Sequence, residues 1–162
     1  MTDRSFHDDL IVIDALEASN WDRELLEELC AGGVTAVHIT LVFWEDARTT
    51  LDNIGRWHRL FENHDDIIMP VRSAADIEEA KWLGKTGIIF GFQNCSPIED
   101  DIGLVEVCRQ LGACFMQLSY NNQSLLATGC YESEDPGITR MGRQVIREMN
   151  RVGLVVDMSH SA

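Results

Sequence analysis

The sequence predicts an α/β fold in which parallel strands alternate with helices, and three observations support this. Short apolar runs that are rich in β-branched residues, such as 34–43 and 87–92, alternate with longer amphipathic stretches. The apolar runs are continuous, as expected for parallel strands that are buried on both faces. Glycine follows several of the predicted helices, where it can end a helix in the left-handed conformation. We therefore expect one buried sheet covered by helices.

The predicted elements follow one another with short connections. Strands are expected at residues 10–14, 34–43, 87–92, 113–118 and 154–158. Helices are expected at residues 23–30, 46–63, 74–83, 98–111 and 140–151. Residues 67–71 fit either a short strand or a loop. Ser73 is a favourable N-cap for the helix that follows it, and Asp76 three residues later approximates a capping box. The polar loop 120–137 is long by ordinary standards, and loops of this length are often functional.

Two architectures fit this order of elements: an open doubly wound sheet and a (β/α)8 barrel. A nucleotide-binding sheet requires a glycine-rich turn after its first strand, whereas residues 14–18 contain no glycine. This favours the barrel. A complete barrel takes about 250 residues. We therefore predict a partial TIM-type (β/α)8 barrel of about five βα units, in which residues 1–162 form the N-terminal portion of one domain, truncated after the fifth strand.

Composition excludes several classes of partner. The chain has 27 acidic and 13 basic residues and a formal net charge of -14, which argues against nucleic acid and against an anionic membrane surface. No apolar stretch approaches the roughly 20 residues that span a bilayer. The polar start at residues 1–9 does not resemble a signal peptide, and the five cysteines show no C-x-x-C spacing. We expect a reduced, cytoplasmic protein with no nucleic-acid partner and no membrane segment.

In a barrel the active site lies at the carboxyl ends of the strands. His160 directly follows the last predicted strand, where an imidazole can bind zinc or transfer protons. The alternative is a hydrogen-bonded histidine at the rim. His38 lies inside a strand and is expected to be a satisfied core residue. Cys95 follows the 87–92 strand, but no nearby base would activate it as a nucleophile.

The C-terminal stretch carries a specific resemblance. Residues 137–161 read GITRMGRQVIREMNRVGLVVDMSHS and resemble the segment GLTxFGxxVVxEMNRLGMxxDLSH of the membrane (renal) dipeptidases. Residues 116–121 are similar to the LTLTHN strand of that family, and residues 13–14 to the start of its DGHND strand. The resemblance implies a barrel metallopeptidase that hydrolyses dipeptides or related small amides, with two zinc ions bridged by a glutamate.

The resemblance also implies roles for individual residues. His160 matches a histidine that binds the second metal, and Gln93 falls at the bridging glutamate, which makes it a weak metal ligand. Tyr120 stands where the family has a histidine that contacts substrate, so we expect Tyr120 and Asn121 to bind substrate.

Two further positions depart from the family's metal site. The His-x-Asp pair of the first strand reads as Leu16 and Ala18, which cannot bind zinc. The resemblance therefore implies one or two zinc ions. The substitutions at Leu16, Ala18 and Gln93 argue against the two-ion site, whereas a one-ion centre that includes His160 remains an alternative. The catalytic residues are not identified, and a later histidine ligand and an aspartate would lie beyond Ala162.

Two other functions stay open. A metal-poor homologue could bind a small amino-acid-like ligand without hydrolysing it, as the residues at the ligand positions suggest. A role in assembly through a homo-oligomer predicts an exposed apolar sheet edge after the last strand. Whichever function holds, including the hydrolysis that the resemblance implies, we expect the 162-residue chain to be inactive alone, because it lacks the second half of the site.

Overall fold

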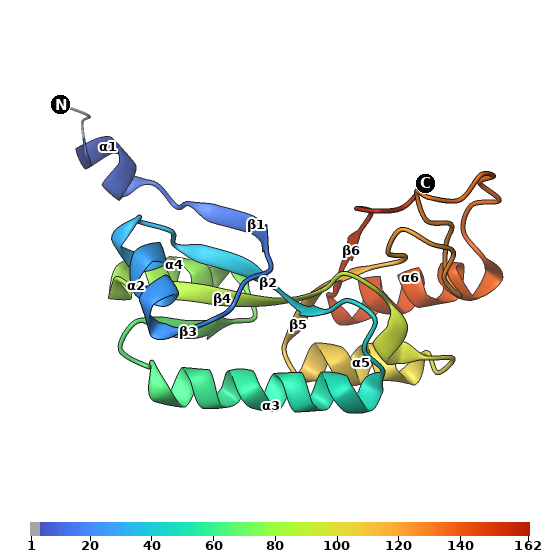
Figure 1. Ribbon diagram of the computed structural model, residues 1–162, viewed down its shortest axis with the longest axis horizontal. Coiled ribbons are helices and arrows are strands. Elements are labelled where there is room, and N and C mark those ends of the chain that lie inside the picture. Colours follow the sequence, from blue (N-terminus) through green and yellow to red (C-terminus); the bar gives the residue numbers. More distant parts are fainter. Residues whose placement is uncertain (1–3) are drawn as a thin grey trace. The chain divides into compact units, whose positions relative to one another are not determined.

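The computed structural model describes residues 4–162, and in them parallel strands alternate with helices (Figure 1). The strands are β1 (Ile13–Glu17), β2 (Ala36–Val42), β3 (Ile68–Val71), β4 (Thr86–Phe92), β5 (Ala113–Gln117) and β6 (Val155–Asp157). The helices are α1 (Arg4–Asp9), α2 (Arg23–Ala31), α3 (Ala47–Asn63), α4 (Ala74–Leu83), the 3-10 turn η1 (Ser96–Ile98), α5 (Gly103–Gln110) and α6 (Arg140–Val152). The sheet order is β1-β2-β4-β5-β6, with β3 beside β4. This α/β arrangement is that of a partial (β/α)8 barrel, as the sequence predicts.

The chain divides into two compact units, which are described separately. The first unit contains the residues up to Ile39 together with Arg56–Ile89. The second unit contains Thr40–Gly55 and Phe90–Ala162. Strands β2 and β4 each contribute residues to both units.

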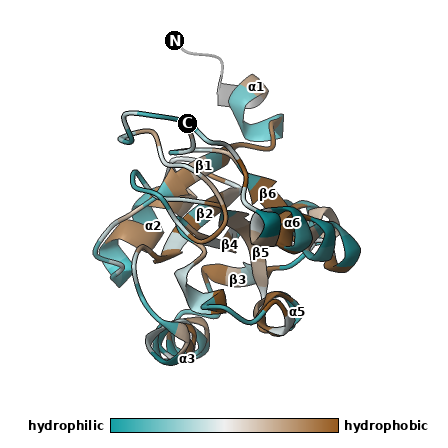
Figure 2. Ribbon diagram, turned by 90° about the vertical axis from the view of Figure 1, so that its right-hand side faces the viewer, coloured by the Kyte–Doolittle hydropathy of each residue, from teal (hydrophilic) through white to brown (hydrophobic). Residues whose placement is uncertain are grey.

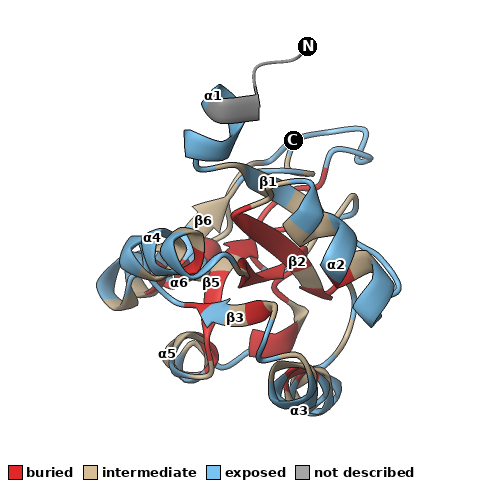
Figure 3. Cartoon of the chain, turned by 90° about the vertical axis from the view of Figure 1, so that its left-hand side faces the viewer, coloured by how far each residue is buried: buried red, intermediate tan, exposed pale blue. Residues whose placement is uncertain are grey.

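In the first unit, β1 pairs with the start of β2 and β3 pairs with the start of β4, both in parallel. The backbone N–H of Gly87 on β4 donates to the carbonyl of Thr35 just before β2, at 2.8 Å. Figure 3 shows the resulting core: β2 is buried, whereas the outer surface of α2 is exposed. Leu26 on α2 and Val37 on β2 are both fully buried. Leu26 thus lies on the apolar face of α2 that contributes to the core.

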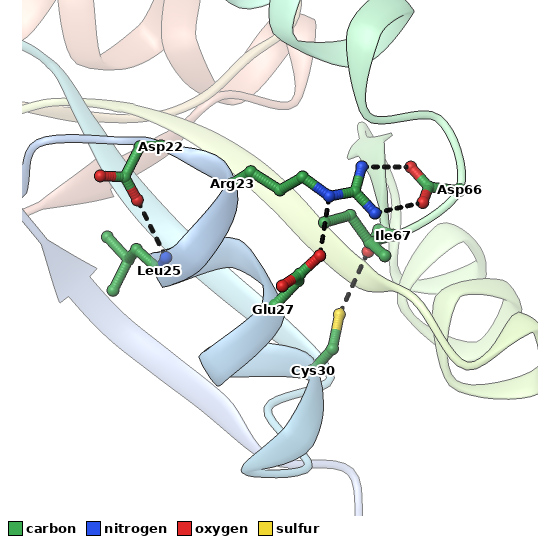
Figure 4. Close-up of polar contacts among 7 residues, drawn as sticks. All are labelled: Asp22, Arg23, Leu25, Glu27, Cys30, Asp66 and Ile67. Carbon is green, nitrogen blue, oxygen red and sulfur yellow. Dashed lines mark hydrogen bonds and ion pairs between the residues drawn. The ribbon is translucent and has the colours of Figure 1, made fainter.

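Helix α2 is fixed at its start by polar contacts (Figure 4). The side chain of Asp22 is the N-cap and accepts a hydrogen bond from the N–H of Leu25 at 3.0 Å. The guanidinium of Arg23 forms ion pairs with Glu27 and with Asp66, each at 2.7 Å. The hydrogen bonds from Arg23 lower the pKa of the Asp66 carboxyl below its ordinary value. These groups are largely exposed, so we assign them an orienting role and little stability.

Helix α4 begins as predicted. The Oδ2 atom of Asp76 accepts hydrogen bonds from the backbone N–H groups of Arg72 at 2.7 Å and Ser73 at 2.8 Å. These bonds, that from Arg72 first, lower the pKa of the Asp76 carboxyl. The predicted contribution of Asp76 to a capping box is therefore confirmed.

In the second unit, the end of β4 pairs with β5, and β5 pairs with β6, again in parallel. Helix α6 begins at its N-cap Thr139, whose hydroxyl accepts from the N–H of Gly142 at 2.9 Å. Its buried residues Gly142, Val145 and Met149 recur at three- and four-residue spacing. The rest of α6 is mostly hydrophilic, as the teal ribbon in Figure 2 shows.

The first strand differs from its prediction. It runs from Ile13 to Glu17 rather than over residues 10–14, and Leu10 and Ile11 are 40% and 49% exposed. Ile13 inside the strand is 49% exposed as well, because β1 lies at one end of the sheet order, so this strand is not buried on both faces as predicted. Helix α1 precedes it, where only a polar tail was expected.

The predicted helix 98–111 is also shorter than expected. Pro97 sits in the first turn of η1, and Glu99 ends that turn with φ of 50°, outside the helical region. Helix α5 then starts at Gly103, whose N–H donates to the Asp101 side chain at 2.8 Å. Residues 67–71, whose sequence fits either a strand or a loop, contain the strand β3, Ile68–Val71. Among residues 4–162 no helix has both the length and the apolar character needed to cross a membrane.

Candidate functional site

Three of the predicted site residues lie together at the carboxyl ends of β5 and β6. Tyr120 and Asn121 follow β5, and His160 follows β6. The rings of Tyr120 and His160 have centroids 4.4 Å apart and planes inclined by 40°. The Nδ1 atom of His160 lies 2.7 Å from the Oδ1 atom of Asn121. Because β5 and β6 are parallel neighbours, their ends meet at one edge and bring these distant residues into contact.

Two aromatic residues at the end of β2 extend this cluster. The rings of Phe43 and Trp44 meet Tyr120 edge to face, with centroids 5.7 Å and 5.3 Å away. The Glu45 carboxylate accepts hydrogen bonds from the N–H groups of Phe43 at 2.6 Å and Trp44 at 2.9 Å, which fixes the turn that presents them. Trp44 is 57% exposed. The resemblance assigns Trp44 no role, but in the structure its partly exposed ring provides an apolar surface next to Tyr120.

The loop after β5 holds the C-terminal segment against this cluster. The N–H of Cys130 donates to the carbonyl of His160 at 2.9 Å, and Gly129 forms an antiparallel bridge with Ser161. The loop also closes on itself, since the N–H of Tyr131 donates to the carbonyl of Asn121 at 2.8 Å. His160 is therefore held by its backbone as well as by its side chain.

Gln93, the predicted weak ligand, is buried at the end of β4. Its side-chain amide donates to the hydroxyl of Thr40 on β2 at 2.7 Å, and its backbone N–H donates to the carbonyl of Val42 at 2.9 Å. The structure therefore places Gln93 in a hydrogen-bonded link between two strands. A neutral amide in this role supplies no negative charge to a metal ion.

A second polar pair joins β5 to β6 and was not among the predicted site residues. Gln117 on β5 is fully buried, and its Nε2 atom donates to Oδ2 of Asp157 on β6 at 3.2 Å. Within residues 4–162 the Oε1 atom of Gln117 has no hydrogen-bond partner. The sequence offered one signal for this pair, a glutamine at the end of an otherwise apolar strand. Because buried polar groups are normally paired, such a glutamine predicts a polar partner on a neighbouring strand.

In the first unit, Leu16 and Ala18 lie at and just beyond the end of β1, where the resemblance places metal ligands. The N–H of Leu16 donates to the side chain of Asp14 at 3.2 Å. His38 is buried with its Nδ1 atom 2.7 Å from the carbonyl oxygen of Ala15. The prediction that His38 is a hydrogen-bonded core residue is confirmed.

The described residues do not fit a two-ion metal centre. Between residues 4 and 162 no group of three or more His, Cys, Asp or Glu side chains is placed to hold a metal ion. This agrees with the donor chemistry, because the side chains of Leu16 and Ala18 have no atom that can bind a metal, and Gln93 offers only a neutral amide oxygen where the family has a carboxylate. Cys95 is buried, and burial raises the pKa of its thiol, so it is not an activated nucleophile either.

Comparison with known proteins identifies relatives of this chain. An amidohydrolase from Pseudomonas aeruginosa of known crystal structure is 46% identical, with a TM-score of 0.96, over 99% of this chain and 49% of its own. The probable dipeptidase PvdM from the same species is similar in fold alone, at 14% identity and a TM-score of 0.87, over 98% of this chain and 49% of its own. Dipeptidase verJ from Clonostachys rogersoniana is 27% identical over 74% of this chain and 31% of its own length.

The chain thus spans about half the length of the solved relatives and about a third of the curated one. A model of the family described as membrane dipeptidase, peptidase family M19, matches residues 11–162. This match covers nearly all of the described chain and includes every strand and the cluster around His160. The chain therefore belongs to the membrane dipeptidase family, peptidase family M19.

Proposed function

We propose that this protein hydrolyses dipeptides or closely related small amides, and that the cluster around His160 forms part of its substrate site. The observation that carries the proposal is the meeting of Tyr120, Asn121 and His160 at the carboxyl ends of two strands of a dipeptidase-family barrel. These are the positions at which barrel enzymes place their chemistry, because the loops there converge.

The chemistry of the cluster suits a small zwitterionic substrate. The Tyr120 phenol can donate one hydrogen bond to a carbonyl or carboxylate oxygen. The exposed face of Trp44 beside it offers apolar contact to a substrate side chain. Asn121 is predicted to contribute to substrate binding, and its Oδ1 atom also bonds to His160.

Members of the family depend on a metal, and zinc is the ion that the resemblance implies. The described residues do not supply a two-ion site. We therefore propose that His160 binds a single ion in the intact site, together with ligands outside the described cluster. His160 is suitable because an imidazole with one nitrogen hydrogen-bonded presents the other to a metal or a substrate proton.

The test is hydrolysis of a panel of dipeptides by the intact protein that contains this chain, with and without added zinc. His160→Ala should lower kcat/KM by about 100-fold or more, by analogy with the 10- to 100-fold losses that follow removal of a supporting residue. His58→Ala is the matched control, because His58 is an exposed histidine on α3 and its loss should leave kcat/KM unchanged.

A second variant separates binding from positioning. Tyr120→Phe keeps the ring contacts with His160 and Trp44 but removes the hydroxyl, so KM should rise if the phenol contacts the substrate. Dipeptide binding in calorimetry without turnover, and without any effect of zinc, would contradict hydrolysis and favour the metal-poor binding homologue. The mass of the protein in analytical ultracentrifugation would test the expected homo-oligomer. The cytoplasmic location remains a prediction from the sequence.

A further inference from the structure

We infer that Asn121 is a positioning residue that holds the His160 ring in the tautomer with its proton on Nδ1, which leaves the lone pair on Nε2. This role for Asn121 goes beyond the substrate contact proposed above. It rests on the proposed function only where activity is measured, because the tautomer is a property of the protein alone.

The hydrogen bond determines the tautomer. The Oδ1 atom of Asn121 lies 2.7 Å from Nδ1 of His160, and a carboxamide oxygen can only accept. The proton between the two atoms must therefore belong to Nδ1. A neutral imidazole carries one proton, so Nε2 is then unprotonated and can act as a hydrogen-bond acceptor, a base or a metal ligand.

A second donor supports this orientation of the Asn121 amide. The thiol of Cys130 lies 3.8 Å from the same Oδ1 atom and is placed to donate to it. The carboxamide oxygen has two lone pairs and can accept from both the thiol and the imidazole N–H.

The ring is also restricted in rotation. Tyr120 stacks obliquely on His160 at 4.4 Å, so turning the ring to exchange its two nitrogens requires the tyrosine to move away. The hydrogen bond sets which nitrogen faces Asn121, and the tyrosine ring keeps it there.

The backbone brings the two side chains to this geometry. Asn121 has φ of 63° and His160 has φ of 62°, both in the left-handed region. Asparagine is one of the few residues with a side chain that adopts this region readily. The loop and the segment at His160 are tied together by the Cys130 and Gly129 contacts described above. Asn121 therefore combines a backbone that adopts the left-handed region with a side-chain oxygen that accepts from His160. Glycine would lack the acceptor, and leucine would lack both.

The experiment reads the tautomer directly, by long-range ¹H–¹⁵N correlation of the His160 ring in protein freed of metal by a chelator. The wild type should show a protonated Nδ1 and an unprotonated Nε2. Asn121→Gly removes the acceptor and keeps the left-handed backbone, so the proton should redistribute toward Nε2. Asn121→Asp keeps an acceptor oxygen at the same place and should retain the wild-type tautomer.

The matched control is Asn122→Ala, which removes an exposed asparagine side chain next in sequence and should leave the ring signals unchanged. In turnover assays Asn121→Gly should lower kcat/KM by about 10- to 100-fold, and Asn121→Asp should recover part of the loss. A wild-type protein with the proton on Nε2, or Asn121→Gly with wild-type ring signals, would overturn the inference. Unchanged activity in His160→Ala would instead overturn the proposed function and leave the tautomer result standing.

Discussion

Gly129 should tolerate no side chain, because its α-carbon faces the backbone of the loop that carries Asn121. A methyl group added at Gly129 would lie 2.1 Å from the carbonyl oxygen of Asn121 and 2.5 Å from that of Asn122. Ordinary contacts begin at 3.4 Å, so the loop would have to shift by roughly 1 Å. Overpacking of this kind costs about 1–3 kcal/mol. We therefore expect Gly129→Ala to lower the free energy of unfolding by that amount.

Urea unfolding followed by circular dichroism would measure this loss. The midpoint should fall with little change in slope, and the melting temperature should fall by about 2–4 °C for each kcal/mol. The shifted loop should also weaken the hydrogen bond between Asn121 and His160, which the ring signals of His160 would report. Asn122→Ala serves as the control, with an expected change within about 0.5 kcal/mol. If Gly129→Ala unfolds within that same margin of the wild type, the crowding derived from the structure is wrong.

Three further outcomes are expected. Gly142→Ala gains up to about 1 kcal/mol of helix propensity, but its new methyl group would lie 2.1 Å from the carbonyl oxygen of Leu126, so urea unfolding should show a net loss of stability. Asp76→Ala should cost roughly 0.3–1.5 kcal/mol at neutral pH. Because the folded-state pKa of Asp76 is lowered, its contribution is present above the ordinary value of 3.8 and is lost as the pH falls through the folded-state pKa, so acid titration should bring the wild type and the variant together. Iodoacetamide should label the exposed Cys130 well before Cys108, whose thiol pKa burial raises to about 11, and equal labelling in peptide mass spectrometry would contradict this.

Much of the fold follows from local patterns in the sequence. The amphipathic period of residues 46–63 and the β-branched run at 34–43 predicted elements whose observed bounds, Ala47–Asn63 and Ala36–Val42, differ by one or two residues. Thr139 and Gly153 marked both ends of α6 correctly. These features depend on neighbours within one turn or one strand, which is the range over which sequence patterns carry information.

The misplaced elements depended on contacts that no local pattern contains. The apolar run at residues 10–14 looks like a buried strand, but β1 starts only at Ile13 and lies at one end of the sheet order, where Ile11 and Ile13 are each 49% exposed. The helix expected from residue 98 was interrupted by the conformation of Glu99, which a sequence pattern does not reveal.

The sequence by itself determined the succession of strands and helices and the family, because residue type and spacing carry these directly, and it predicted His160 as a site residue. Only the tertiary structure decided which groups surround that histidine. Asn121 and Tyr120 come from the end of β5 and meet His160 at the end of β6, because parallel strands bring their carboxyl ends to one edge, and Trp44 from the end of β2 contacts Tyr120. Tertiary structure also decided that Gln93 at the end of β4 bonds to Thr40 on β2. The partner of a buried amide depends on the register between strands and not on its neighbours in the chain.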